Sequence, residues 1–258
     1  MASPYDVDPV ISFRGVKKAF GPKVIYDDCT LDIYPGETIT IIGGSGTGKS
    51  VTLKMLIGLL STDAGSITAF GTEVTNLGEA GLLPIRRRVA MLFQGAALFD
   101  SLTVAQNIKY PLREHRWGDE KKMDERVTEV LEMVGLPGSQ KLKPSELSGG
   151  MRKRVGLARA IAVEPDVILY DEPTTGLDPI NVRRINGLIL SLQAKLKVTS
   201  IVVTHDMDAC FTFTDRIALL HERRFSFVGT PEEARASSDR YLQEFIAGGK
   251  GTLEEDVE

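Results

Sequence analysis

The feature that most limits the fold of this chain is a set of four short apolar runs, each of which ends in glycine or polar residues. Segments of helical period separate the runs. Nearly continuous apolar strands that alternate with helices are typical of a parallel sheet covered by helices on both faces. The sequence therefore predicts an α/β fold with a mostly parallel sheet. The four runs are TITIIGG (38–44), VAMLFQ (89–94), VILYDE (167–172) and SIVVTH (200–205).

Two strand-rich stretches precede the first of these runs. They are VISFRGVKKAF (10–20) and VIYDDCTLDIY (24–34), separated by Gly21-Pro22. Because glycine and proline mark turns between strands, these stretches predict an N-terminal antiparallel β subdomain. After the last run, residues 216–229 predict a hairpin.

The segment between the second and third runs is long for a single crossover and has helical periodicity over most of its length. We therefore expect an inserted helical subdomain there. One final helix is expected to begin at Thr230-Pro231, because proline is favoured in the first helical turn. The predicted divisions are a single domain over 1–258, a core at 10–94 and 164–230, a helical insertion at 95–163, and a C-terminal helix with an acidic tail at 231–258.

Composition excludes several classes of protein. The 258 residues carry a net charge of -4, so no overall basic field predicts a nucleic-acid partner. Cys29 and Cys210 lie far apart without a metal-ligand spacing, which predicts reduced thiols. We expect no signal peptide and no membrane span, since no apolar run approaches roughly 20 residues. Any membrane association is expected to come through a partner.

The segment GGSGTGKS fits the phosphate-loop pattern G-x-x-x-x-G-K-[ST], directly after a strand and before a helical run. Backbone N–H groups of such a loop hold phosphates, and the helix N-terminus adds partial positive charge. Lys49 is expected to reach the β- and γ-phosphates and Ser50 to bind Mg²⁺. A plain glycine turn explains Lys49 poorly, because a cation opposes the helix dipole there. The residues expected to hold ATP are Gly43, Gly44, Ser45, Gly46, Thr47, Gly48, Lys49, Ser50 and Val51.

Two adjacent acids end the third apolar run. Asp171 and Glu172 could begin a solvated loop, but strand ends in an α/β sheet face the ligand crevice. We expect Asp171 to hold Mg²⁺ and Glu172 to orient and deprotonate the attacking water. The following PTTGLDP segment adds Asp178 on a turn.

Gln94 and His205 end the second and fourth runs in the same manner. Taken singly, each could be an ordinary strand-end or core residue. Taken together, all four runs end in groups that suit phosphate, which makes coincidence the weaker explanation. Gln94 is expected to contact Mg²⁺ and the attacking water, and His205 to hydrogen-bond the γ-phosphate.

A second glycine-rich segment, LSGGM (147–151), lies about a hundred residues after the phosphate loop. Ser148 could simply cap a helix, although a helix N-terminus is also an anion site. Because the segment ends the helical insertion, we expect it not to reach its own loop. A second copy of the chain, related by a two-fold axis, would place each LSGGM over the other copy's ATP.

These motifs, in this order, resemble those of ATP-binding cassette (ABC) ATPases over roughly residues 10–230. The resemblance implies a P-loop NTPase with a RecA-like core that works as a nucleotide-sandwich homodimer. It implies that Ser148 and Gly150 contact the γ-phosphate held by the partner copy, and that Gly149 and Asp178 also belong to the nucleotide site. It also places Phe20 where an aromatic residue stacks on adenine, although Phe20 could instead be an edge-strand core residue.

The chain is further similar to the ATPases of Mla/Mce-type lipid transport systems, the MlaF-like group. The similarity lies in YPLRE (110–114) and in Met151, which replaces the usual glutamine of the signature. It implies an MlaE-like permease partner, small regulatory and substrate-binding subunits, phospholipid traffic between inner and outer membranes, and a place on the cytoplasmic face of the bacterial inner membrane. A cassette for polar amino acids or another small solute is the main alternative. A nucleotide-dependent scaffold without turnover is a third.

The family's permease contact is expected at the loop after Gln94. Leu98, Phe99 and Leu102 are candidates for an apolar docking patch there, and could equally belong to the core.

Overall fold

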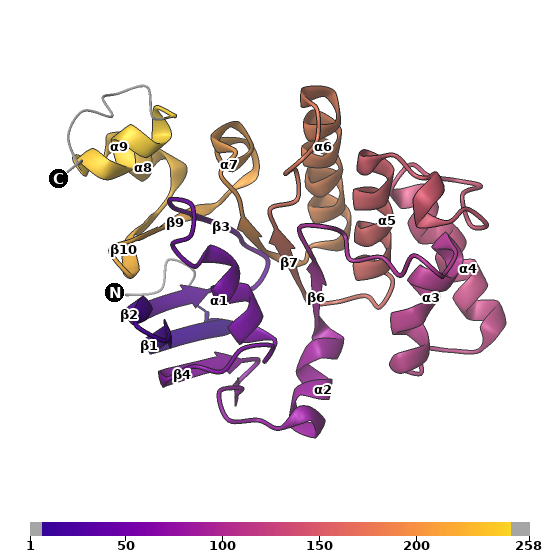
Figure 1. The fold of residues 1–258 in the computed structure, drawn as a ribbon, viewed down its shortest axis with the longest axis horizontal. Helices are drawn as coiled ribbons and strands as arrows, with labels where there is room; N and C mark the ends of the chain where they lie inside the picture. Colours follow the sequence, from indigo (N-terminus) through magenta and orange to yellow (C-terminus); the bar gives the residue numbers. More distant parts are fainter. Residues whose placement is uncertain (1–6, 249–258) are drawn as a thin grey trace.

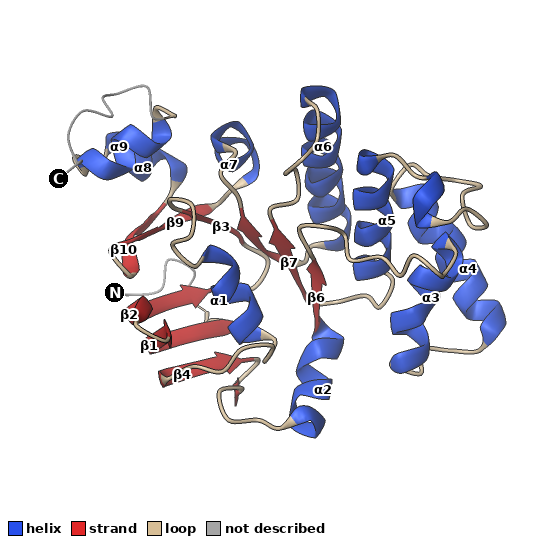
Figure 2. Ribbon diagram, viewed as in Figure 1, coloured by secondary structure: helices blue, strands red, loops and turns tan. Residues whose placement is uncertain are grey.

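The computed structural model describes residues 7–248, and within them a six-stranded sheet forms the centre of the molecule (Figures 1 and 2). Its strand order is β10-β9-β3-β8-β7-β6, and only the β9–β10 pair is antiparallel. All four predicted apolar runs are parallel strands, and the predicted hairpin is β9–β10. The strands are β3 (Thr38–Ile42), β6 (Val89–Leu92), β7 (Val167–Asp171), β8 (Thr199–Val203), β9 (Arg216–His221) and β10 (Arg224–Gly229).

A second sheet confirms the predicted antiparallel β subdomain. Its order is β2-β1-β4-β5, with β1 pairing on both sides. Apolar side chains of this sheet, such as Phe13, share one core with Ile41 of β3 and Leu53 of α1. Helix α1 therefore lies between the two sheets (Figure 1). The elements are β1 (Ile11–Phe20), β2 (Lys23–Ile33), β4 (Ala64–Ala69), β5 (Thr72–Glu73) and α1 (Lys49–Leu56).

The connection from β6 to β7 is helical, as the sequence predicts. Thr103, Asp119 and Ser148 each cap one of its α-helices by accepting a backbone N–H. Helix α5 packs on α3 and α4 and also belongs to the core that contains Tyr170 of β7. It therefore joins the helical layer to the sheet. The elements are α3 (Val104–Glu114), α4 (Glu120–Met133), the 3₁₀ turn η1 (Pro144–Glu146) and α5 (Gly149–Ile161).

Three further helices flank the central sheet. They are α2 (Glu79–Arg88), α6 (Pro179–Leu196) and α7 (Met207–Phe213). None of the helices within residues 7–248 combines the length and apolar character that crossing a bilayer requires.

The prediction of one final helix is wrong. The structure has two short helices, α8 (Pro231–Ala236) and α9 (Arg240–Ile246). Ser237 is extended after α8, and the Asp239 carboxylate accepts the Leu242 N–H to begin a new helix. A second cap therefore interrupts what the pattern read as one element. The predicted acidic tail lies outside the described residues.

Candidate functional site

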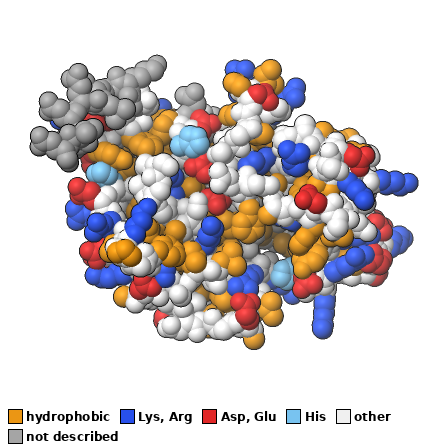
Figure 3. Space-filling view, viewed as in Figure 1, with side chains coloured by type: hydrophobic (Ala, Val, Ile, Leu, Met, Phe, Trp, Pro, Cys, Tyr) orange, Lys and Arg blue, Asp and Glu red, His pale blue; other side chains and the backbone are white. Residues whose placement is uncertain are grey.

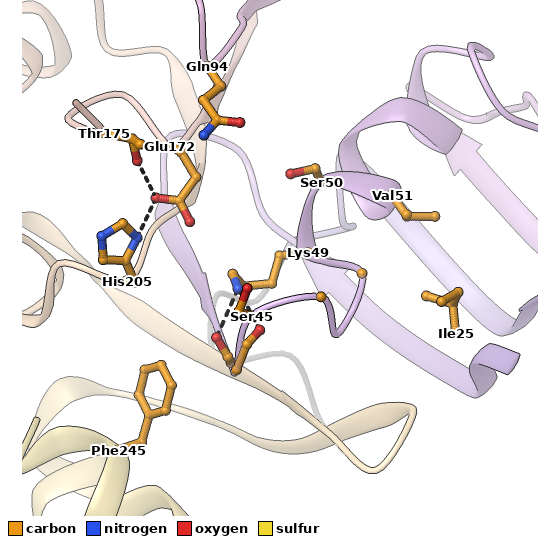
Figure 4. Close-up of a pocket in the computed structure, with 14 residues that line it drawn as sticks. Ile25, Ser45, Lys49, Ser50, Val51, Gln94, Glu172, Thr175, His205 and Phe245 are labelled. Carbon is orange, nitrogen blue, oxygen red and sulfur yellow. Dashed lines mark hydrogen bonds and ion pairs between the residues drawn. The ribbon is translucent and has the colours of Figure 1, made fainter. Parts of the chain in front are cut away.

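A cavity of about 560 Å³ lies where β3, β6, β7 and β8 end (Figure 4). The polar residues predicted at these strand ends meet there: the phosphate loop, Gln94, Glu172 and His205. Parallel strands bring their carboxyl ends to one edge, which explains why residues more than a hundred positions apart share this wall. The lining residues are Ile25, Gly43, Gly44, Ser45, Gly46, Gly48, Lys49, Ser50, Val51, Gln94, Glu172, Thr175, His205 and Phe245.

The phosphate loop is a backbone structure that glycine makes possible. Gly48, just before α1, has φ +109°, and a Cβ there would lie 2.3 Å from Cγ2 of Ile25. Lys49 Nζ donates hydrogen bonds of 2.9 Å to the carbonyls of Gly43 and Gly44. Thr47 does not line the cavity; its hydroxyl donates to the Gly44 carbonyl at 2.9 Å. Burial lowers the pKa of Lys49, while Glu172 and Asp171 oppose that shift. The loop therefore presents a buried cation beside two acids.

Ser50 lines the cavity and contacts Asp171, which lies behind it and is not part of the cavity wall. Ser50 Oγ donates to Asp171 Oδ1 at 2.5 Å, and Asp171 is only 5% exposed. Hydroxyl, carboxylate and amide oxygens, the last from Gln94, are ligands that suit Mg²⁺. Within residues 7–248 no cluster of three or more His, Cys, Asp or Glu side chains could hold a metal.

Glu172 and His205 lie next to each other on one side of the cavity. The Glu172 carboxylate lies 2.7 Å from His205 Nδ1 and accepts a 3.0 Å hydrogen bond from Thr175 (Figure 4). Glu172 also has φ +49°, an uncommon conformation for a residue with a Cβ. The Glu172 N–H donates to the Val203 carbonyl at 2.9 Å. The structure thus holds the carboxylate from two sides, and its link to His205 was not expected from the sequence.

The signature residues lie outside this cavity, at the start of α5. Ser148 caps α5 by accepting the Met151 N–H at 3.2 Å, and neither Ser148, Gly149 nor Gly150 lines the phosphate-loop cavity. Asp178 caps α6 and also lies outside the cavity. The Asn181 side-chain hydrogen bond lowers the pKa of Asp178. One chain therefore brings the loop, Gln94, Glu172 and His205 together in this cavity, whereas Gly149 of the signature lines a separate hollow with Gln94 and Thr175.

Phe20 is 45% exposed at the end of β1 and is not part of the cavity wall. Lys18 Nζ lies 5.3 Å from the centroid of its ring. The core interpretation of Phe20 is therefore wrong, and an exposed ring remains free for stacking. Ile25, on the neighbouring strand, is the β-subdomain residue that lines the cavity.

Besides Ile25, three residues of the site were missed by sequence reasoning. Thr175 follows Glu172 by three residues, a spacing that could have indicated the contact. Phe245 of α9 lines the cavity, on the side away from Ile25 in Figure 4. Lys153 of α5 is buried and donates to the backbone carbonyl of Glu172 at 3.2 Å. No local pattern indicates the last two, because each depends on contacts across the fold.

A second hollow of about 510 Å³ lies between β6, α2 and α3. Figure 3 shows hydrophobic side chains gathered where α3 faces this part of the sheet. Phe99 is 43% exposed there, and its ring centroid lies 4.8 Å from that of Tyr110. Leu98 and Leu102 are only half-exposed, and Leu98 packs on the helical core. Of the three predicted docking residues, Phe99 alone lines this hollow.

Comparison with known proteins shows the family of this chain. Residues 26–175 match the ABC transporter family, and the chain belongs to it. A solved ATP-binding cassette, dimeric and bound to ADP and phosphate, is similar with a TM-score of 0.78 and 30% identity over 85% of this chain and 98% of that one. The chain is thus an ABC ATPase that binds and hydrolyses ATP and serves a transporter. ATPases of this family form dimers and pair with permeases.

Two groups of relatives carry more particular names. The "Intermembrane phospholipid transport system ATP-binding protein MlaF" of Haemophilus influenzae is 40% identical, covering 88% of this chain and 86% of the relative. The "Probable ribonucleotide transport ATP-binding protein mkl" of Mycobacterium leprae is 41% identical, covering 92% of this chain. This chain spans 69% of the length of that relative and 66% of its Mycobacterium tuberculosis counterpart.

Proposed function

We propose that this ATPase drives a permease of the Mla/Mce type that moves phospholipid between the inner and outer membranes. It would act from the cytoplasmic face of the inner membrane. The observation that carries the proposal is the 40% identity to MlaF over 86% of that protein, together with Met151 in the signature. The ribonucleotide named for the mkl relatives is the second candidate cargo. A ribonucleotide is a small polar solute, so this candidate belongs to the small-solute alternative; a cassette for polar amino acids is a further member of that alternative.

Hydrolysis is proposed to use Glu172 as the general base. The water to be deprotonated would lie between Glu172 and the γ-phosphate, which Lys49 would hold. His205 Nδ1, at 2.7 Å, would keep the carboxylate aimed at that water. Mg²⁺ bound with the nucleotide would neutralise charge on the phosphates. Ser50, Asp171 and Gln94 are its proposed ligands.

Each catalytic centre is proposed to be shared by two chains. The cavity contains no signature residue of its own chain, and Ser148 begins a helix whose N-terminus suits an anion. Two copies facing each other would place each signature over the partner's γ-phosphate. Closing of this dimer on ATP would pull on the permease, and hydrolysis would release it.

The hollow beside Phe99 is the proposed permease contact. Apolar residues such as Leu59 and Tyr110 line it, together with the three basic residues Arg86, His115 and Arg159. No Asp or Glu lines this hollow. An amphipathic permease helix that presents apolar side chains and a carboxylate would match both properties.

Cargo is tested by reconstitution. The ATPase and the permease that copurifies with it are placed in vesicles containing labelled phospholipid or enclosing a labelled ribonucleotide. Mla-type function predicts ATP-dependent phospholipid movement that Glu172→Gln abolishes. Ribonucleotide movement without phospholipid movement would overturn the phospholipid proposal in favour of the second cargo.

A further inference from the structure

Lys153 connects two loops of the catalytic site through one buried ammonium group. The residue lies on α5, the helix that begins with the signature, and is 5% exposed. Its Nζ donates to the backbone carbonyl of Gln94, and to that of Glu172 at 3.2 Å. An ammonium has three N–H donors, so one side chain can hold both carbonyls. The ends of β6 and β7 are therefore joined through α5.

Left-handed backbone occurs at one of the two contacts, Glu172, and in the loop that follows the other contact, Gln94. Glu172 has φ +49°, and in the loop after Gln94 the two alanines Ala96 and Ala97 have φ +61° and +46°. Residues with a Cβ adopt this left-handed conformation at a cost, and keep it only when surrounding contacts hold them. Hydrogen bonds from charged donors are among the stronger ways to do so.

Helix α5 holds the Gln94 loop at a second point. Arg159 donates to the carbonyls of Ala96 and Ala97, both at 2.8 Å. Between the two cations, a Cβ at Gly156 would lie only 2.9 Å from Leu92 Cδ1, so the helix lies tightly against the end of β6. Helix α5 therefore holds the Gln94 loop both through Lys153 and through Arg159.

The charge of Lys153 is set by opposing effects. Burial lowers the pKa of Lys153, and the nearby carboxylates of Asp171 and Glu172 counter that shift. The site thus contains two buried cations, Lys49 on the phosphate side and Lys153 behind the carboxylates. Lys49 is already assigned to the phosphates, whereas the phosphate chemistry leaves Lys153 without a role.

We infer that Lys153 is a positioning residue for hydrolysis: it fixes the backbone of Glu172 and of Gln94 to the signature helix, so that all three move together. The inference rests on the proposed role of Glu172 as the base. The inference means that displacement of α5, whether by a permease or by a partner's nucleotide, changes the orientation of the Glu172 carboxylate toward the attacking water. Lys153 itself does not touch the nucleotide.

The test compares Lys153→Met with Lys153→Arg and with a matched control, Arg154→Met. Arg154 is also a cation of α5 that donates to backbone carbonyls, but its acceptors are Val134 and Gly135, away from the cavity. Steady-state kcat, ATP affinity and melting temperature are measured for the full-length chain. Lys153→Met is expected to lower kcat by about tenfold or more with ATP affinity changed less than about twofold. Lys153→Arg is expected to recover most of that loss.

Three results would overturn the inference: a kcat for Lys153→Met within about twofold of the parent, an equal fall in kcat and ATP affinity, or the same loss in Arg154→Met. If Lys153→Met does not fold, Lys153→Gln, which keeps an N–H donor, is compared with Lys153→Arg by the same criteria. Glu172→Gln is measured in parallel. Full activity of Glu172→Gln overturns the assigned base, whereas an inactive Glu172→Gln beside a fully active Lys153→Met overturns only the role of Lys153.

Discussion

At the scale of single residues, the site combines buried charged side chains with a backbone in an unfavourable conformation. Glu172 accepts from Thr175, contacts His205 and has a left-handed backbone, all within one residue. Strain of this kind concentrates at functional sites and depends on surrounding contacts. The position of Glu172 at the cavity was predictable, because the residue follows an apolar strand. Its backbone conformation was not, because it depends on contacts with β8 and α5.

Glu172→Gln is expected to retain ATP binding and to lower kcat by about a hundredfold or more, the usual scale for loss of a general base. Glutamine has nearly the same shape, but it cannot take a proton from water. The change is measured by phosphate release and by binding of a fluorescent ATP analogue. A variant that hydrolyses ATP at near-parent rates would remove Glu172 from the mechanism.

Lys49→Ala is expected to weaken nucleotide binding. Lys49 would exchange its bonds to the Gly43 and Gly44 carbonyls for bonds to phosphate oxygens, which carry full charge. A hydrogen bond between charged groups contributes about 1.5–3 kcal/mol, or roughly tenfold to a hundredfold in affinity. Calorimetry with ATP measures this loss. Unchanged ATP affinity and unchanged turnover together would contradict the proposed phosphate contact.

At the scale of elements, the sequence pattern predicted the strands and the loop that depend on interactions between residues close in the chain. The four apolar runs became parallel strands, and the glycine-rich loop lies between β3 and α1, because burial and turn chemistry act over a few residues. The break between α8 and α9 was missed, since a second N-cap is a weak signal inside a helical pattern. The contact between α9 and the phosphate loop joins residues about 200 positions apart, and no periodicity carries such information.

Helix α9 yields a prediction about nucleotide binding. Phe245 lines the cavity, and a Cβ at Gly44 would lie 3.3 Å from the Tyr241 hydroxyl, so α9 packs directly on the loop. Stacking of Tyr241 on His221, with centroids 3.6 Å apart, holds the helix there. Phe245→Ala is expected to weaken ATP binding by roughly threefold to tenfold, because apolar surface at the cavity wall is lost.

The control for this prediction is Ile246→Ala. Ile246 is a half-buried neighbour on α9 that does not line the cavity. Both variants lose apolar contact with the rest of the chain, and only Phe245→Ala changes the nucleotide site. Equal ATP affinity in the two variants would show that α9 contributes to stability alone.

At the scale of the whole molecule, the chain divides its motifs between two places. The phosphate-loop cavity lies over the central sheet, while the signature lies at the start of α5 and outside that cavity. In the shared-site proposal, a second copy of the chain supplies the signature for each phosphate-loop cavity, and the relation between the two copies is reciprocal. Under the shared-site proposal, hydrolysis would depend on the approach of the two chains, and that approach would couple ATP turnover to the permease.

Mixed dimers test this division directly. Ser148→Arg spoils the signature and leaves the phosphate loop intact, whereas Lys49→Ala does the reverse. A mixed dimer then has one complete site, formed by the loop of the first chain and the signature of the second, and one site with both defects. Equal mixing of the two chains is expected to restore roughly a quarter of the parent ATPase activity, since half of the dimers are mixed and each retains one of two sites. Each variant alone should remain near background, so activity in the mixture can come only from sites shared between chains.

A mixture no more active than its components would mean either that each chain completes its own site or that one intact site cannot turn over beside a damaged one. Covalently linked dimers of one parent chain and one chain with both substitutions separate these explanations. If the sites are shared, both sites of such a dimer carry one defect and the dimer is inactive. If each chain completes its own site, the parent chain keeps one whole site and the dimer is active.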